Sequence, residues 1–224
     1  MGENVKSKPP AKPQENIYEQ AKGLIEREEF TQAVSLLSLL AASGDAEAQF
    51  LLGSLFFTSA KVDFAESKCW LEKAAAQDHA EATYCLASIQ QTDDLVFDEQ
   101  AYVRLLHRAG ELGSPAAQYD LGALYATGDG PIPKDDCEAV RWYSKAAGQG
   151  CAEAQYNLGT MLLEGEGTEQ NTAGGIALME QAANNGNLYA AKVLADFYKF
   201  GPYGISPDPE KAAYWNNKAG EFKA

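Results

Sequence analysis

Two histidines and four cysteines carry the most reactive side chains of this 224-residue chain. Histidine could act as a general base or hold a metal ion, and a cysteine thiolate could bind zinc or act as a nucleophile. Neither His79 nor His107 lies at metal-ligand spacing from a pair of cysteines, and the chain has no CxxC motif. We interpret the cysteines as free thiols in a reducing compartment, although their spacing leaves a disulfide open. They are Cys69, Cys85, Cys137 and Cys151.

Two loops hold part of a ligand-binding motif. The segment GDGPIPK, which begins at Gly128, lacks the spacing of a phosphate-binding loop, and no strand is predicted before it. The acidic loop Asp129–Glu138 lacks the alternating oxygen ligands and closing glutamate of a calcium loop. Helix N-capping explains paired acids such as Asp135 and Asp136. The sequence therefore predicts no catalytic residue, no metal site and no cofactor, and we expect the protein not to be an enzyme.

The net charge of −14 limits the partners. Residues 17–187 hold 26 acidic and 10 basic residues, so this part carries −16. Such a chain is poorly suited to nucleic acid or to an anionic membrane surface. Its longest apolar stretch, Ala33–Gly44, is shorter than the roughly 20 residues of a membrane span. The acidic residues either keep the surface solvated or complement a protein with a basic surface.

Residues 1–16 contain three prolines and three lysines and have no apolar core of a signal peptide. Their composition predicts a flexible tail. Without a visible export signal we expect a cytoplasmic protein. An exported or periplasmic protein whose signal has been removed would have the same sequence.

The elements that would position a binding surface recur at intervals of 34 to 37 residues. Similar segments begin at Ala46, Ala80, Pro115, Ala152 and Leu188, for example AEAQFLLGSLFF and AEAQYNLGTMLL. Each carries a leucine followed by Gly or Ala. The leucines are Leu52, Leu86, Leu121, Leu158 and Leu194. Because Gly inside a helix costs about 1 kcal/mol relative to Ala, a recurring small residue predicts two helices in close contact.

A second helical pattern completes each repeat. It has a large apolar residue at Trp70, Leu105, Trp142, Leu178 and Trp215. Alanine follows four residues later, at Ala74, Ala109, Ala146, Ala182 and Ala219. Residues four apart lie on the same face of a helix. Each repeat is therefore predicted to be a helix pair.

The repeat boundaries follow from these patterns. We predict a flexible tail at 1–16, an N-terminal helix pair at 17–45, and repeats at 46–79, 80–114, 115–151, 152–187 and 188–224. One helix pair cannot bury its apolar faces alone, whereas stacked pairs can. The predicted fold is one continuous all-α domain, a right-handed superhelical solenoid of about six helix pairs.

The pattern AEAQxxLGxLY, then GxG, then EAxxWYxKAAxQGxAEAQ resembles the Sel1-like repeat, a subfamily of tetratricopeptide-like helical repeats. Repeats three and four match closely, whereas repeat two has QQTDDLVFDEQ in place of the Gly-rich loop and Leu105 in place of tryptophan. The resemblance implies a protein–protein interaction scaffold, often a bacterial adaptor, without enzyme activity. In some members a disulfide joins the two helices of each repeat, but the four cysteines here occupy different repeat positions.

The resemblance also implies where a partner would bind. In tetratricopeptide-like repeats it lies on the concave face, at places 2, 5, 9, 12 and 13 of the first helix of each pair. The candidate residues in this chain are Glu47, Phe50, Ser54, Phe57, Glu81, Tyr84, Ser88, Tyr119, Glu153, Tyr156, Thr160, Tyr189 and Lys192. Place 5 is aromatic in four repeats, with glutamate one turn away in three, which suits Lys or Arg side chains. The rings could instead pack between repeats, and full burial of all of them would rule out a binding role for this aromatic row.

Two functions remain open, beside a third possibility, a non-binding structural or maturation role through oligomerisation of exposed terminal repeats. The first is an adaptor that holds a protein or peptide partner on the concave face. The second is an acidic inhibitor or immunity-type protein that neutralises a basic enzyme or toxin domain. The polar final segment KAAYWNNKAGEFKA favours a monomer.

Overall fold

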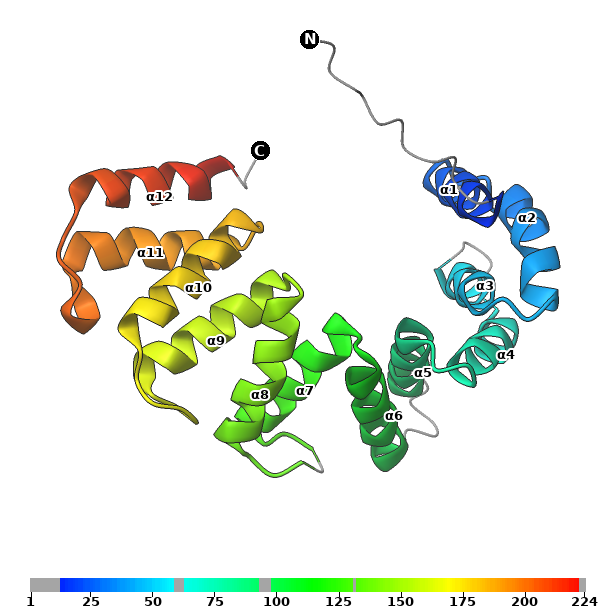
Figure 1. Ribbon diagram of the computed structural model, residues 1–224, viewed down its shortest axis with the longest axis horizontal. Helices are drawn as coiled ribbons and strands as arrows, with labels where there is room; N and C mark the ends of the chain where they lie inside the picture. Colours follow the sequence, from blue (N-terminus) through cyan, green and yellow to red (C-terminus); the bar gives the residue numbers. More distant parts are fainter. Residues whose placement is uncertain (1–12, 59–62, 93–97, 131, 222–224) are drawn as a thin grey trace, which may run out of the picture. The chain divides into compact units, whose positions relative to one another are not determined.

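The computed structural model describes residues 13–58, 63–92, 98–130 and 132–221, and every regular element in this part is helical (Figure 1). The α-helices are α1 (Pro13–Glu26), α2 (Phe30–Ala42), α3 (Ala46–Thr58), α4 (Phe64–Ala75), α5 (Ala80–Thr92), α6 (Glu99–Leu112), α7 (Pro115–Thr127), α8 (Asp136–Gly148), α9 (Ala152–Glu164), α10 (Thr172–Asn184), α11 (Leu188–Phe200) and α12 (Pro209–Glu221). A short 3₁₀ helix, η1 (Pro202–Gly204), precedes α12. The predicted all-α fold of paired helices is confirmed.

The chain folds as two compact units, Met1–Ile89 and Gln90–Ala224. In the first unit α3 packs against α2 and α4, and in the second unit α7 packs against α6 and α8. The continuity of the solenoid across Ile89 stays a prediction. The predicted tail lies outside the described residues up to position 12, and α1 begins at Pro13 rather than at Ile17. Residues 93–97 of the altered loop of repeat two also lie outside them.

Local sequence explains where the first helix of a pair begins. Asp45 Oδ1 accepts from Ala48 N, and Asn187 Oδ1 accepts from Ala190 N. Ser114 caps α7 in the same way, so each of these side chains satisfies a backbone N–H that has no partner within its helix. Glycine in the left-handed conformation ends α7, at Gly128 (φ 73°), and α9, at Gly165 (φ 75°). These caps set the repeat length that the sequence shows.

The residues that recur at the same place in each repeat are here called columns. The predicted core columns lie between the helices. All five leucines and all five alanines of these columns are at most 7% exposed. Trp142 is fully buried and Trp215 nearly so, while Trp70, Leu105 and Leu178 are half-buried. The Gly or Ala that follows each recurring leucine was predicted to mark a close contact between two helices, and the structure shows one. A Cβ added to Gly122 would lie 2.5 Å from Cδ1 of Tyr143, so only glycine fits this contact between α7 and α8.

A buried amide contact, here called the glutamine clamp, recurs where helix pairs meet. In repeat three Gln118 Nε2 donates to the carbonyl of Gly110 at 2.9 Å, and Gln149 Nε2 donates to Gln118 Oε1 at 2.8 Å. The equivalent donors and acceptors are Gln49 to Ala41 O and Gln77 to Gln49 in repeat one, and Gln155 to Ala147 O and Asn185 to Gln155 in repeat four. Each bond contributes about 0.5–1.5 kcal/mol net.

Repeat two replaces both members of the clamp. Thr83 takes the place of the first glutamine and Leu112 the place of the second. The hydroxyl of Thr83 donates to the carbonyl of His79, one turn earlier in the chain. The polar tie to the preceding helix pair is therefore absent from these two positions.

All four cysteines are free thiols. Among the described helices none is both long and apolar enough to span a membrane. The described residues also contain no group of three or more His, Cys, Asp or Glu side chains that could hold a metal ion.

Candidate partner-binding face

The candidate residues lie on one side of each first helix, here called the first-helix face. On α3, α5, α7, α9 and α11, places 3, 4 and 7 are buried, whereas places 2, 5 and 9 are half-buried or exposed. None of the rings at place 5 is fully buried, so the condition that would rule out a binding role is not met. These rings belong to Phe50, Tyr84, Tyr119 and Tyr156.

Two of these rings also pack between repeats. Tyr119 of α7 packs against the core cluster that contains Ala154 and Leu158 of α9. Tyr156 of α9 packs against the cluster that contains Leu194 of α11. Burial raises the pKa of the Tyr119 phenol, which keeps it a neutral hydrogen-bonding group. Each ring thus contributes one side to the fold and leaves part of its surface to solvent.

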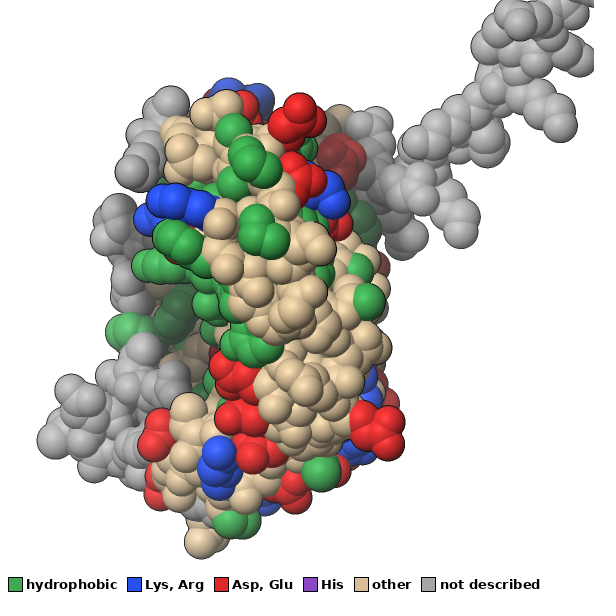
Figure 2. Space-filling model, turned by 90° about the vertical axis from the view of Figure 1, so that its left-hand side faces the viewer, with side chains coloured by type: hydrophobic (Ala, Val, Ile, Leu, Met, Phe, Trp, Pro, Cys, Tyr) green, Lys and Arg blue, Asp and Glu red, His purple; other side chains and the backbone are tan. Residues whose placement is uncertain are grey.

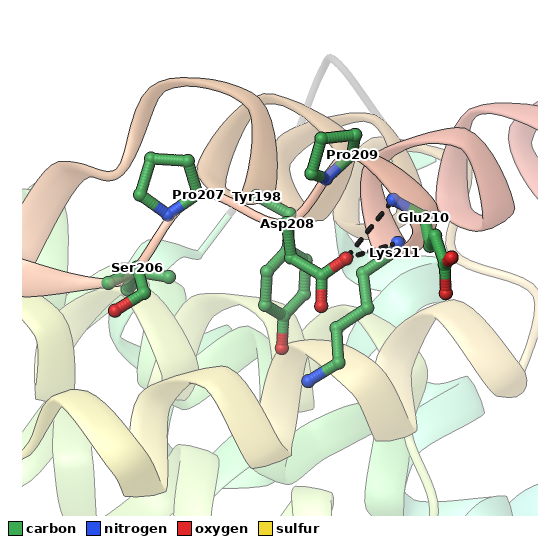
Figure 3. Close-up of a pocket in the computed structure, with 8 residues that line it drawn as sticks. Tyr198, Ser206, Pro207, Asp208, Pro209, Glu210 and Lys211 are labelled. Atoms are coloured by element: carbon green, nitrogen blue, oxygen red, sulfur yellow. Dashed lines mark hydrogen bonds between the residues drawn. The ribbon is translucent and has the colours of Figure 1, made fainter.

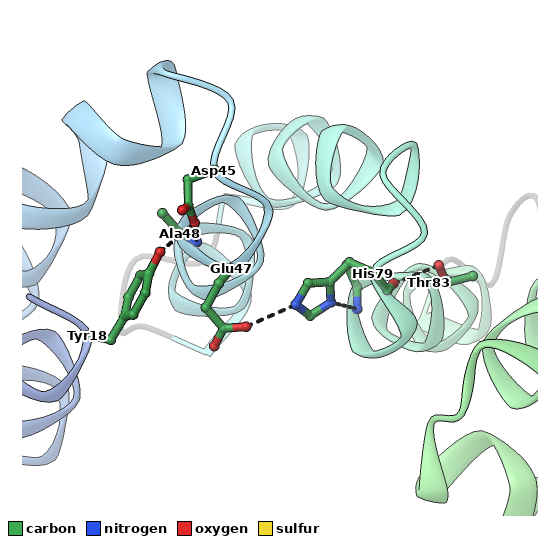
Figure 4. Close-up of polar contacts among 7 residues, drawn as sticks. Tyr18, Asp45, Glu47, Ala48, His79 and Thr83 are labelled. Carbon is green, nitrogen blue, oxygen red and sulfur yellow. Dashed lines mark hydrogen bonds and ion pairs between the residues drawn. The ribbon is translucent and has the colours of Figure 1, made fainter. Parts of the chain in front are cut away.

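In the first unit Glu47 forms a hydrogen bond with His79 (Figure 4), and Phe50 also contacts His79. The backbone N–H of Ala82 donates to His79 Nδ1 at 3.2 Å, so His79 caps α5 and carries its proton on Nε2. That Nε2–H donates to Glu47 Oε2 at 3.1 Å, and this hydrogen bond lowers the pKa of Glu47. The imidazole also stacks on Phe50 with 4.7 Å between ring centroids.

The hydroxyl-bearing candidates turn toward their own helices. Ser88 Oγ donates to the carbonyl of Tyr84 at 3.3 Å, and Thr160 Oγ1 donates to that of Tyr156 at 3.2 Å. Ser54 is half-buried and helps to line an apolar hollow of about 300 Å³ between α1 and α3. These residues shape the face more than they offer free polar groups.

The other candidates are more open. Phe57 is half-buried and meets Phe64, itself 50% exposed, edge to face at 5.8 Å. Glu81 is half-buried and Glu153 is exposed. Tyr189 and Lys192 are exposed, because no described helix covers them in the way that α11 covers Tyr156. The sequence therefore predicts which residues lie on the first-helix face but not how exposed each of them is.

A second hollow, of about 670 Å³ and widely open, lies beside the loop before α12 (Figure 3). Its Asp208 and Lys211 side chains have local partners. Asp208 Oδ1 accepts from the backbone of Glu210 and Lys211, and Lys211 Nζ lies 4.8 Å from the ring centroid of Tyr198. The hollow therefore presents a helix cap and a cation–π pair, and we assign no ligand to it.

Sequence reasoning missed two features of this region. The sequence excludes His79 from a cysteine–histidine metal site but does not show its contacts with Glu47 and Phe50. The glutamine clamp was not foreseen either, although Gln49, Gln118 and Gln155 recur in the AEAQ segments. The signal was the same residue at the same place in three repeats.

Comparison with known proteins agrees with the repeats. A model of the Sel1 repeat matches residues 46–79, 115–151, 152–187 and 188–221. The second repeat, with its changed clamp, is not among the matched residues. No curated protein sequence matches the chain.

Solved structures support the same assignment. The chain is similar to a Sel1 repeat protein from Oxalobacter formigenes, with 30% identity over 84% of this chain and 75% of that one, and a TM-score of 0.68. It is also similar to c5321, a protective antigen of uropathogenic Escherichia coli with an SLR fold, with 26% identity, a TM-score of 0.75, and coverage of 94% of this chain but 49% of that one. The immunity protein PA5088 from Pseudomonas aeruginosa shares the fold, with 23% identity over 96% of this chain and 84% of that one, and a TM-score of 0.64.

Sel1 repeats typically mediate protein–protein interaction, and their scaffold is generally non-catalytic. The family model covers more than half of the chain, and its matched ranges coincide with helix pairs of the structure. The chain therefore belongs to the Sel1 repeat family.

Proposed function

We propose that this protein is a non-enzymatic scaffold that binds a basic segment of a protein partner on its first-helix face, which the sequence predicts to be concave. The observation that carries the proposal is a recurring pair, a glutamate followed one helical turn later by an aromatic residue. Glu81 precedes Tyr84 on α5, and Glu153 precedes Tyr156 on α9, with each ring partly exposed. A Lys or Arg side chain could contact the carboxylate and the ring face together.

The magnitudes require several such contacts. An exposed ion pair contributes about 0.2–1 kcal/mol, and an exposed cation–π contact about 0.5–1 kcal/mol. Micromolar binding corresponds to about −8 kcal/mol. A single repeat therefore cannot hold a partner, and we expect binding to need the Glu–aromatic pairs of more than one repeat together with apolar contacts.

The experiment compares two charge-matched double variants. Glu81→Lys/Glu153→Lys changes the first-helix face, whereas Glu72→Lys/Glu111→Lys makes the same charge change on second helices, at exposed positions of α4 and α6. A partner captured by the wild-type chain from its native host is identified by mass spectrometry and purified, and its affinity for each variant is measured by calorimetry.

We expect the face variant to bind at least about tenfold more weakly, a loss of about 1.4 kcal/mol, while the control stays within about twofold. Equal weakening in both variants would mean that only the overall charge matters. Unchanged affinity in the face variant would exclude this face. Circular dichroism of both variants checks that the helices are intact.

The charge of −16 on residues 17–187 favours a second candidate, an inhibitor of a basic enzyme or toxin domain. The likeness to PA5088 is one of fold and does not carry this proposal. A cognate inhibitor should bind at nanomolar strength or tighter, with an association rate that falls steeply as salt rises. Stopped-flow association at several salt concentrations separates it from an adaptor. The cytoplasmic location and the monomeric state stay predictions.

A further inference from the structure

Exposed aromatic side chains gather in the fifth repeat. Of the six exposed large hydrophobic residues in the described part of the chain, four belong to this repeat. They are Tyr189, Phe200, Tyr203 and Tyr214. Tyr189 and Phe200 lie on α11 and are 68% and 67% exposed. Figure 2 shows hydrophobic side chains exposed over the upper part of one side of the molecule, above a gathering of Asp and Glu.

Two lysines lie between the rings on α11. Lys192 and Lys199 are exposed, and their spacing from Tyr189 and Phe200 places all four residues on one side of the helix. The Nζ atoms lie 5.8 Å from the Tyr189 centroid and 4.8 Å from the Phe200 centroid. Neither ammonium forms an ion pair with a carboxylate of the described residues. We call Tyr189, Lys192, Lys199 and Phe200 the α11 face.

The α11 face reverses the charge of the equivalent places in earlier repeats. Place 2 is Tyr189 here but glutamate in repeats one, two and four, and place 5 is Lys192 here but aromatic in the first four repeats. Asp196 at place 9 removes only part of the positive charge. Tyr119 and Tyr156 at place 5 pack against the next first helix, but an ammonium there would be costly to bury. A further repeat is therefore a poor occupant of this face.

A face needed only for solubility would not expose two large rings beside two lysines. The rings can contact an apolar side chain, and the ammonium groups can keep hydrogen bonds if the ligand supplies carboxylates. Tyr189 and Phe200 are about 16 Å apart along the helix axis, which is the length of about five extended residues. The face thus fits a short segment rather than a single side chain.

We propose that the α11 face binds an acidic segment of the protein partner, with carboxylates on Lys192 and Lys199 and a separate apolar side chain against each of the rings of Tyr189 and Phe200. This rests on the proposed function, because the same partner is expected to lie along the first helices. The partner then carries opposite charges at its two ends. Within the second unit its basic part lies over Glu153 of repeat four and its acidic part over the fifth repeat.

The test uses two fluorescein-labelled peptides of about twelve residues, long enough to cover the face. One alternates Asp or Glu with Leu, and the other has Lys or Arg at the same positions. Binding is followed by fluorescence anisotropy with the wild-type chain and with Lys192→Glu/Lys199→Glu. The matched control is Lys68→Glu/Lys145→Glu, which makes the same charge change at exposed positions of α4 and α8.

We expect the acidic peptide to bind the wild type although the whole chain carries −14, because the attraction is local. The α11-face variant should bind it at least about tenfold more weakly, and the control within about twofold. The basic peptide should bind the α11-face variant as well as it binds the wild type, or better. Loss of acidic-peptide binding together with retained basic-peptide binding would support both proposals separately.

Two results would overturn the inference. The first is acidic-peptide binding that is absent, or weakened equally by both variants. The proposed function would then still be tested independently by the Glu81→Lys/Glu153→Lys variant. The second is self-association of the wild type in sedimentation equilibrium that the α11-face variant abolishes, because a second copy would then occupy the face. Circular dichroism of each variant ensures that a loss of binding is not a loss of fold.

Discussion

The third and second repeats share buried leucine and alanine positions but differ in their contacts with the preceding helices. In repeat three Trp142 is fully buried, and Gln118 ties α7 to the carbonyl end of α6. In repeat two Leu105 is half-buried, and Thr83 bonds only within its own part of the chain. Both repeats keep the buried leucine and alanine columns. The comparison shows that these columns are buried with or without the tryptophan and the clamp, which are features of particular repeats.

The largest expected effect comes from the tryptophan column. Trp142→Ala should lower the free energy of unfolding by about 3–5 kcal/mol, because it removes a fully buried ring and leaves a cavity. Leu105→Ala, at the equivalent place of repeat two, should cost clearly less because that side chain is half-buried. Urea unfolding of both variants measures the difference. Equal losses would show that the two repeats are packed alike, and a loss below about 1 kcal/mol for Trp142→Ala would mean that the column is not core.

The clamp gives an intermediate effect. Gln118→Leu removes one buried and one partly buried hydrogen bond and leaves the carbonyl of Gly110 without this donor, so we expect a loss of about 1–3 kcal/mol. Thr83→Val keeps the shape of the side chain and removes one local bond, so its cost should stay near 1 kcal/mol or below. Thermal unfolding of the two variants sharpens the comparison. A larger loss of stability in Thr83→Val than in Gln118→Leu would contradict the stabilising role of the clamp.

The smallest effect concerns pH. His79 caps α5 and lowers the pKa of Glu47, whereas the equivalent cap of repeat three, Ser114, does not titrate. A carboxyl whose folded pKa is lowered stabilises the fold above its unfolded pKa, and this stability is lost as the pH falls through the folded value. The Glu47 side chain is 45% exposed, so screening keeps the contribution below about 1 kcal/mol.

Glu47→Gln should therefore reduce the stability difference between pH 7 and pH 4 in urea unfolding. Glu153→Gln, which changes an exposed carboxylate at the same place of repeat four, serves as the control and should leave that difference unchanged. Identical pH dependence of wild type and Glu47→Gln would contradict the role of His79.

Much of the fold could be predicted because the repeat copies its signals. The helices that begin at Ala46, Ala80, Pro115, Ala152 and Leu188 start where the sequence predicts, since a turn and a capping position precede each apolar pattern. The close contact at Gly122 was also predictable, because glycine is costly in a helix unless space demands it.

The candidate site was less predictable because exposure depends on the next repeat. Tyr156 and Lys192 occupy the same place, yet the first is partly covered by the α11 cluster and the second is free of such cover. A sequence pattern gives the face of a helix but not what lies over it. The contacts of His79 with Glu47 and Phe50 span about thirty residues, a distance over which periodicity carries no information about side-chain pairing.

The glutamine clamp has a consequence for how such a chain can grow. Both of its side chains, such as Gln118 and Gln149, come from the same repeat, and the neighbour supplies only a backbone carbonyl. Every residue type has that carbonyl. A copied repeat would therefore arrive with its joint complete, and a deleted one would leave no orphaned side chain next door. Duplication or loss of a whole unit could lengthen or shorten the array without compensating changes elsewhere in the gene.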